Sequence, residues 1–177
     1  ATGVAWSRRY RKEDDIVISF LGDGAVNQGS FHEALNLAGL WNLPIIYLIE
    51  NNLYAVATHL NESVPIPGLS QRAASYGMKA RVVDGMDPVA VKLVVDEAVK
   101  DLRSGSPPYI IEALTYRFFH HAGDIPGSAF GYRTRAEENE WKQRDPLETF
   151  PRQLRQSGIL KEEEDERIRE IVAQVIR

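Results

Sequence analysis

The chain has 177 residues, of which 44% are apolar and 26% charged, so it is long enough to fold around a substantial buried core. Its formal net charge of −4 argues against non-specific binding to nucleic acid or to anionic membranes. The absence of cysteine excludes disulfides, a thiol nucleophile and cysteine-ligated metals, which fits a reducing compartment. No apolar run reaches the roughly 18 residues of a membrane span, and residues 1–15 lack a signal peptide's apolar stretch.

Strand-like and helix-like patterns alternate in the first part of the chain, which predicts an α/β fold with a parallel sheet and flanking helices. The continuous apolar run 15–22 is typical of a strand buried on both faces. A helix is predicted from Ser30, because Ser30 and Glu33 have the spacing of a capping box, and a second strand follows over 45–50. The helix carries one apolar stripe, made of Phe31, Ala34, Leu35, Ala38 and Trp41.

A third strand is predicted over 80–85 and a fourth over 109–116, with a long helix between them. Asp87 supplies the N-cap of this helix, Pro88 its first residue, and Gly105 its stop. Its core-facing positions are Val91, Val94, Val95, Ala98 and Leu102.

The pattern changes after the fourth strand. Residues 117–135 show little periodicity and are predicted to form a long loop, and loops of that length are usually functional or disordered. The chain is therefore divided into an α/β region over 1–116, this loop, and a helical region over 136–177.

The helical region has its own start and stop signals. Thr134 and Glu137 form a possible capping box, and a second helix is predicted to begin at Asp145 and to end at Gly158. The last helix is marked by Ile168, Ile171, Val172, Val175 and Ile176.

Polar residues end the first two strands abruptly. Asp23 lies between Gly22 and Gly24, and the pair Asn51–Asn52 follows the second strand. Since parallel strands bring their carboxyl ends to one edge, these side chains should meet there. Carboxylate, amide and carbonyl oxygens suit Mg²⁺, and the glycines would let the backbone turn tightly and approach a diphosphate. Either motif alone could be an ordinary turn, but together they predict a magnesium–diphosphate site.

The order of these motifs resembles a known family. GDG, a helix, a strand and NN together resemble the thiamine-diphosphate (ThDP) motif of ThDP-dependent enzymes. The wider sequence resembles the α subunit of the 2-oxo acid dehydrogenase E1 component, a group that includes pyruvate, branched-chain 2-oxo acid and acetoin-type enzymes. The matching stretches are "GDGAVNQGSFHEALNLAGLWNLPIIYLIENNLYAVAT", "RAASYGMKARVVDGMD", "IIEALTYRFFHH" and "YRTRAEENEWKQRDPL", and they cover nearly the whole chain.

The resemblance implies roles for particular residues. Asp23 and the side chain of Asn52 would ligate Mg²⁺ together with the backbone carbonyl of Tyr54. The backbone amides of Gly24 and Ala25 would contact the diphosphate of ThDP.

The resemblance also distinguishes among the histidines. His121 matches the family's active-site histidine, which would bind near the cofactor and act as a proton donor or orienting group. A solvated loop histidine is the alternative interpretation. The position of His120 varies within the family, and His32 and His59 are expected to lie on a helix face and in a loop without catalytic roles.

Other residues of the loop bear on its order and regulation. Arg117, Tyr132 and Arg133 could organise it by pairing with Asp124 or with phosphate, or they could form surface ion pairs. Ala122 stands where mitochondrial relatives carry a phosphorylated serine. That switch cannot operate here, which favours a prokaryotic source and a cytoplasmic location, with the mitochondrial matrix expected for a eukaryotic source.

The implied function is ThDP-dependent oxidative decarboxylation of a 2-oxo acid with reductive acylation of the lipoyl domain of an E2 partner. The cofactor would supply the difficult chemistry, and the protein orientation and electrostatics. In this family the glutamate that activates ThDP comes from the E1 β subunit, so activity would require that partner in an α2β2 heterotetramer. The apolar stripe of the 30–41 helix could serve that interface or the core. No nucleic acid or membrane partner is expected.

Family α subunits are longer than this chain, and the resemblance begins just before the GDG strand, so we expect a fragment lacking the N-terminal half or one part of a split subunit. Two alternatives remain: another ThDP-dependent enzyme sharing the GDG…NN module, such as a decarboxylase, synthase or acetoin-cleaving enzyme, and a non-catalytic remnant of the fold. The stretches "TYRFFHHAGD" and "YRTR" favour the E1 α subunit. The presence of Asp23, Asn52 and His121 argues against a remnant.

Overall fold

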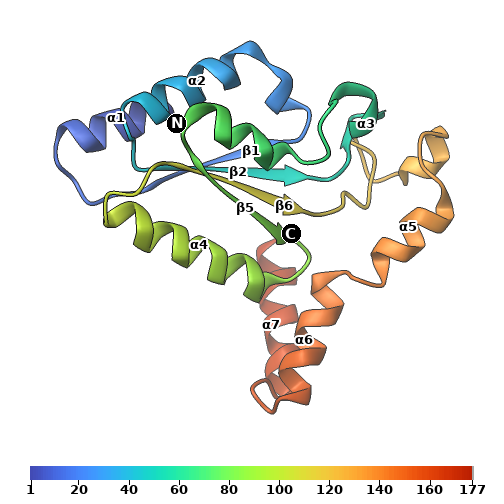
Figure 1. The fold of residues 1–177 in the computed structure, drawn as a ribbon. Coiled ribbons are helices and arrows are strands. Elements are labelled where there is room, and N and C mark those ends of the chain that lie inside the picture. The colour runs from blue at the N-terminus through green and yellow to red at the C-terminus, as the bar shows by residue number, and fades with distance from the viewer. Residues whose placement is uncertain (177) are drawn as a thin grey trace.

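The computed structural model describes residues 1–176, which are organised around a four-stranded sheet of order β1-β2-β6-β5 (Figure 1). The strands are β1 (Val17–Gly22), β2 (Ile45–Asn51), β5 (Lys79–Asp84) and β6 (Tyr109–Leu114). Every neighbouring pair is parallel, which confirms the predicted α/β fold with a parallel sheet. A small antiparallel hairpin made of β3 (Tyr54–Ala55) and β4 (Thr58–His59) follows β2.

Helices cover both faces of the sheet. One face carries α1 (Thr2–Tyr10), α2 (Gly29–Leu40) and the 3₁₀ segment η2 (Leu69–Tyr76), and the other carries α4 (Pro88–Arg103) (Figure 1). Two short elements complete this region, η1 (Ala25–Asn27) and α3 (Leu60–Ser63). The sequence analysis identified α2 and α4 but not α1, the hairpin or the short segments.

The two central strands are buried on both faces, which explains their continuous apolar runs. In β2, Ile45 and Ile49 belong to the core beneath α1 and α2, whereas Ile46 and Leu48 belong to the core beneath α4. Both cores are therefore built on the same strands, and the buried part of the α2 stripe lies in the first of them: Phe31, Leu35 and Ala38.

Two local predictions about the first strand and helix are wrong. β1 forms an edge of the described sheet, and Phe20 on it is 65% exposed, so this strand is not buried on both faces. Helix α2 begins at Gly29 with Gln28 as its N-cap and no side-chain cap. Ser30 and Glu33 therefore do not form a capping box, because η1 leads directly into the helix and places Ser30 inside the first turn.

Helix α4 begins and ends as predicted. The Asp87 carboxylate accepts hydrogen bonds from the amides of Val89 (2.9 Å) and Ala90 (3.1 Å), and Pro88 occupies the first turn. Gly105 follows the helix with a φ of +86°, a left-handed conformation that favours glycine.

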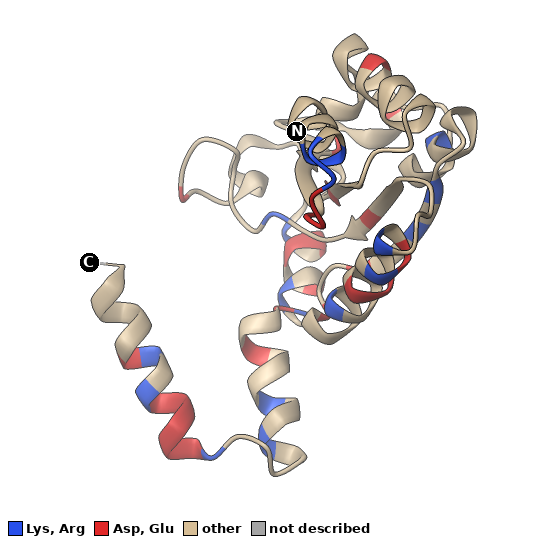
Figure 2. Cartoon of the chain, turned by 90° about the vertical axis from the view of Figure 1, so that its left-hand side faces the viewer, with Lys and Arg blue, Asp and Glu red and all other residues tan. Residues whose placement is uncertain are grey.

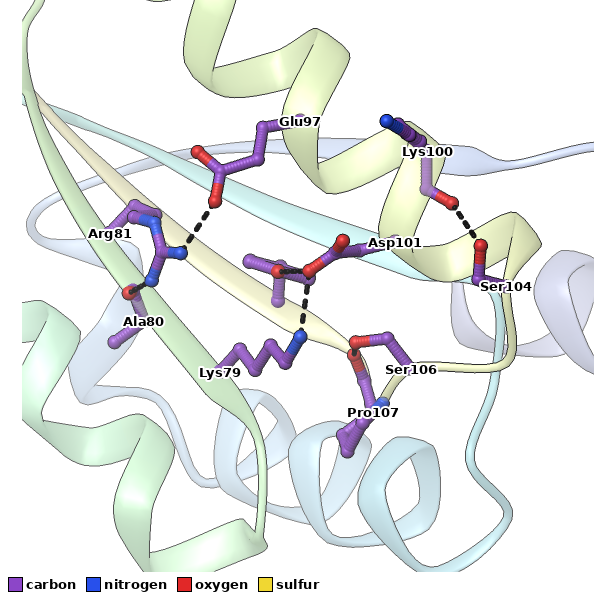
Figure 3. A network of polar contacts seen from close by, with 10 residues as sticks. Lys79, Ala80, Arg81, Glu97, Lys100, Asp101, Ser104, Ser106 and Pro107 are labelled. Carbon is purple, nitrogen blue, oxygen red and sulfur yellow. Dashed lines mark hydrogen bonds and ion pairs between the residues drawn. The ribbon is translucent and has the colours of Figure 1, made fainter.

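A polar network holds the C-terminal half of α4 against the sheet (Figure 3). Lys79 at the start of β5 pairs with Asp101 of α4 at 2.7 Å, and the Tyr109 hydroxyl of β6 donates to the same carboxylate. Arg81 pairs with Glu97 one helical turn earlier at 2.6 Å. The hydrogen bonds from Lys79 and Tyr109 lower the pKa of Asp101, so the carboxylate stays ionised at neutral pH.

The C-terminal part is helical, as predicted, and comprises α5 (Arg135–Lys142), α6 (Pro146–Gln156) and α7 (Glu162–Val175). Helices α6 and α7 form a hairpin that projects from the sheet region (Figure 2). The predicted signals at their ends are present: the Thr134 hydroxyl accepts from the amide of Glu137, Asp145 caps α6, and Gly158 has a φ of +71°. The division of the chain into three regions stays a prediction.

The apolar positions of α7 lie on the surface; they are Ile168, Ile171, Val172, Val175 and, just past the helix, Ile176. No helix among residues 1–176 is long and apolar enough to cross a membrane.

Candidate functional site

The carboxyl ends of β1 and β2 lie side by side because these strands are parallel neighbours. Gly22 is level with Glu50 across the pair, so Asp23 and Asn52 leave the sheet at one edge. β6 ends at the same edge, where Leu114 is level with Asn51. The prediction that these polar residues share one sheet edge is confirmed.

Asp23 is buried without full compensation. Its side chain is 2% exposed, and Oδ2 has no hydrogen-bond partner among the described residues. Burial raises the pKa of Asp23, while the amides of Asp23 and Gly24 and the positive charges of Arg117 and His59 act in the opposite direction. A buried carboxylate oxygen without a partner is costly, and a cation bound there would relieve that cost. The site therefore fits the expected Mg²⁺.

Asn52 and Tyr54 share one turn between β2 and β3. The Asn52 side-chain oxygen accepts a hydrogen bond from the Tyr54 amide at 3.3 Å, and Leu53 between them has a φ of 71°. An amide oxygen has a second lone pair, so this contact leaves Asn52 able to bind a metal. The turn thus brings together two expected oxygen ligands, the Asn52 side chain and the Tyr54 carbonyl.

The neighbouring Asn51 has a structural role instead. It is buried and donates to Glu112 Oε1 at 2.8 Å, while its own oxygen accepts from the Leu53 amide at 3.1 Å. The other Glu112 oxygen accepts from the Ser70 amide at 2.9 Å. Glu112 on β6 therefore fixes Asn51, and Asn51 fixes the turn that presents Asn52.

Gly24 is required by close packing, not by an unusual backbone conformation. Its φ is −68°, an ordinary value, but a Cβ at this position would lie 2.6 Å from the Cβ of Ala55 in the hairpin. Gly22 also lacks a positive φ, and an added Cβ there meets nothing within 4 Å. The expectation that both glycines are needed for a tight turn is therefore wrong. Gly24 allows the hairpin to pack onto the loop after β1.

We expect Gly24→Ala to destabilise the protein by about 1–3 kcal/mol, because the added methyl overlaps Ala55 and the hairpin must shift. The free energy of unfolding of the full-length protein, measured by urea denaturation, checks this. Gly22→Ala is the matched control and should stay within about 0.5 kcal/mol of the wild type. Ala55→Gly added to Gly24→Ala should restore part of the loss, and equal stability of Gly24→Ala and Gly22→Ala would contradict the packing argument.

Two cations that the sequence analysis did not place at the site lie near Asp23. Arg117 donates to the Val56 carbonyl at 2.7 Å and contacts the Tyr132 hydroxyl at 3.5 Å. Val56 has a φ of 57°, which is strained for a β-branched residue. His59 packs edge-on against Tyr54, with ring centroids 5.0 Å apart. No local sequence signal identifies these positions, because they reach Asp23 only through the folding of the hairpin and the segment after β6.

His121 is exposed in the turn that follows His120, and within residues 1–176 no hydrogen bond joins it to Asp23 or to another residue. Its assignment as the active-site histidine stays a prediction. His120, by contrast, is held in place: its Nδ1 lies 3.1 Å from the Tyr132 hydroxyl, and its ring centroid is 4.3 Å from that of Phe130.

Arg133 organises the segment from inside. It is 4% exposed, and its guanidinium lies 4.7–5.1 Å from the ring centroids of Tyr54, Tyr116 and Tyr132. Its Nη1 donates to the carbonyl of Arg117, which joins the two ends of the segment. In the described part of the chain, neither arginine pairs with Asp124, so the expected pairing is replaced by stacking on tyrosines and bonds to carbonyls.

These features define an α/β protein with a polar site at the carboxyl edge of a parallel sheet. Residues 1–177 match the family model described as Dehydrogenase E1 component. The chain belongs to the dehydrogenase E1 component family.

Among curated proteins, the chain is 42% identical to the pyruvate dehydrogenase E1 component subunit alpha of Rhizobium meliloti, over 97% of this chain and 50% of that protein. It is 39% identical to the 2-oxoisovalerate dehydrogenase subunit alpha of Bacillus subtilis, over 92% of this chain and 49% of that protein. The chain thus spans about half the length of the curated relatives it matches.

A solved structure from Mycobacterium smegmatis, provisionally assigned as a thiamin diphosphate-dependent enzyme, has the same fold. Its TM-score to this chain is 0.51 at 21% identity, over 65% of this chain and 20% of that one. At this identity the likeness supports the fold alone.

Proposed function

We propose that the full-length protein is the α subunit of a 2-oxo acid dehydrogenase E1 component that binds ThDP through Mg²⁺. One observation carries the proposal: a family member buries an uncompensated Asp23 carboxylate beside the turn that presents Asn52 and Tyr54. A metal-bridged diphosphate would supply the positive charge that Asp23 lacks and would use the oxygen ligands of that turn.

The residues of this chain divide the work of binding. Asp23, the Asn52 side chain and the Tyr54 carbonyl hold the metal, and the amides of Gly24 and Ala25 donate to the diphosphate. ThDP supplies the carbon nucleophile and the electron sink for decarboxylation when bound. His121 holds or delivers a proton near the reacting centre.

The positive charges near Asp23 support an anionic ligand at this edge. Arg117 and His59 both act on the Asp23 carboxylate, so the local field is not dominated by one negative charge. Within residues 1–176, no three histidine, aspartate or glutamate side chains cluster as a metal site. The proposed ligand set has a single carboxylate and draws its other oxygens from the protein amide and carbonyl, the phosphates and water.

The activity of the full-length protein requires partners. We propose an E1 β subunit, in an α2β2 heterotetramer, and the lipoyl domain of an E2 protein as the acyl acceptor. The relatives act, by their names, on pyruvate and on 2-oxoisovalerate, so these two acids are the substrates to compare. A cytoplasmic location in a prokaryotic source stays a prediction.

The proposal is tested with the full-length α subunit assembled with its β subunit. Calorimetric titration with ThDP should show binding with Mg²⁺ and none with excess EDTA, and thiamine without the diphosphate is the control ligand. The loaded assembly should then decarboxylate pyruvate or 2-oxoisovalerate and acylate a lipoyl domain. Failure to bind ThDP would overturn the proposal, and binding with decarboxylation but no lipoyl acylation would favour another type of ThDP-dependent enzyme.

A further inference from the structure

One carboxylate at the start of α5 is bonded to two tyrosines from different parts of the sheet edge. The Tyr54 hydroxyl donates to Glu137 Oε2 at 3.1 Å, and the Tyr116 hydroxyl donates to Glu137 Oε1 at 3.0 Å. Tyr54 begins the hairpin after β2, and Tyr116 lies just past the end of β6. We call this group, Glu137 with Tyr54 and Tyr116, the Glu137 clamp.

The clamp is held in one geometry by its surroundings. The guanidinium of Arg133 lies over the rings of both tyrosines, and the ring of Trp141 stacks on Tyr116 at 5.1 Å and 5°. Burial, with a contribution from Glu137, raises the pKa of Tyr54 to about 12, and the pKa of Tyr116 is raised as well. Both phenols therefore remain hydrogen-bond donors at neutral pH.

The clamp connects the proposed metal site with segment 117–135. The backbone of Tyr54 carries a proposed Mg²⁺ ligand, and its hydroxyl is bonded to the helix that ends the segment. The other end of the segment is joined to Arg133 through the Arg117 carbonyl. A metal that fixes the Tyr54 carbonyl also restricts the Tyr54 ring, which favours the closed clamp and the ordered segment.

We propose that Glu137 is a positioning residue that couples occupancy of the metal site to the order of segment 117–135 through the Tyr54 hydroxyl. This inference rests on the proposed function, because the coupling begins at the Tyr54 carbonyl as a metal ligand. Coupling of this kind is reciprocal: if Mg²⁺–ThDP orders the segment, loosening the clamp must weaken Mg²⁺–ThDP binding by the same factor.

The test uses Tyr54→Phe and Glu137→Gln in the full-length α subunit assembled with its β subunit. Tyr54→Phe removes only the hydroxyl and keeps the carbonyl. Two quantities are measured: the dissociation constant of ThDP at saturating Mg²⁺, and the rate of tryptic cleavage within segment 117–135 with and without Mg²⁺–ThDP. We expect each variant to bind about tenfold more weakly, the cost of one hydrogen bond to a charged group, and to lose a similar factor of ligand-dependent protection.

Tyr76→Phe is the matched control. Its hydroxyl bonds the His32 ring at 2.7 Å, away from the clamp, so its removal should change neither quantity. The double variant Tyr54→Phe/Glu137→Gln should bind no more weakly than the weaker single variant, because both changes remove the same bond.

The outcomes separate this inference from the proposed function. If the wild-type assembly binds Mg²⁺–ThDP but both variants bind with unchanged affinity, the coupling is wrong and the proposed function stands. The coupling is also wrong if the variants are cleaved faster without ligand while the protection ratio stays that of the wild type, since that is a purely structural effect. If the wild-type assembly binds no Mg²⁺–ThDP, both proposals are overturned.

Discussion

Asp23→Asn is expected to weaken Mg²⁺-dependent binding of ThDP by about 100-fold or more, because even a residue that only orients a metal ligand contributes a factor of 10 to 100. The substitution keeps the shape of the side chain but removes the only carboxylate of the proposed ligand set. Calorimetry on the full-length α subunit assembled with its β subunit measures this directly. Ser19→Ala, on the strand that leads to Asp23, is a control that should bind normally.

The same substitution should stabilise the ligand-free protein at neutral pH. Burial raises the pKa of Asp23, so this residue favours folding only when protonated. That contribution is complete below the ordinary carboxyl pKa of about 4 and is lost as pH rises through the higher pKa of the folded state. The free energy of unfolding of Asp23→Asn should therefore exceed that of the wild type at pH 7, and the difference should shrink toward pH 4.

Saturating Mg²⁺–ThDP should reverse this order, because the ligand stabilises only the protein that binds it. Equal binding by wild type and Asp23→Asn would show that Asp23 is not a metal ligand. A ligand-free wild type as stable as the variant at pH 7 would show that the buried oxygen is compensated in solution. The two measurements test the metal assignment and its cost separately.

The elements that could be predicted are those with signals local in sequence. Helix α4 carries its own N-cap at Asp87, a regular apolar face and a left-handed glycine at Gly105, so its bounds follow from neighbouring residues. The parallel sheet follows from the alternation of elements, and it brings Asp23 and Asn52 to one edge.

The features that escaped prediction depend on contacts between distant residues. The requirement for Gly24 comes from Ala55, and the role of Asn51 comes from Glu112 on β6. The position of Phe20 on an exposed edge depends on which strand pairs with which, and an apolar run cannot reveal this. Local propensity and periodicity carry no information about such pairs, so sequence reasoning found the ligand types but not the residues that position them.

His121→Ala is expected to lower the rate of acyl transfer by about 100-fold, the lower range for loss of a group that moves a proton in the transition state. The side chain is exposed and makes no hydrogen bond within the described residues, so its removal should leave the free energy of unfolding within about 0.5 kcal/mol of the wild type. The dissociation constant of Mg²⁺–ThDP should also change little. The measurements are single-turnover acylation of a lipoyl domain, calorimetry and urea denaturation.

His120→Ala is the matched control, because the two histidines are neighbours with opposite environments. His120 contacts Tyr132 and packs on Phe130, so its loss should speed tryptic cleavage of segment 117–135 and should lower activity through disorder of that segment. His121→Ala should leave cleavage unchanged and lower only the chemical step. If His121→Ala retains full activity while His120→Ala loses it, the catalytic role passes to His120 or the segment as a whole, because only a proton-transfer role separates loss of turnover from loss of order.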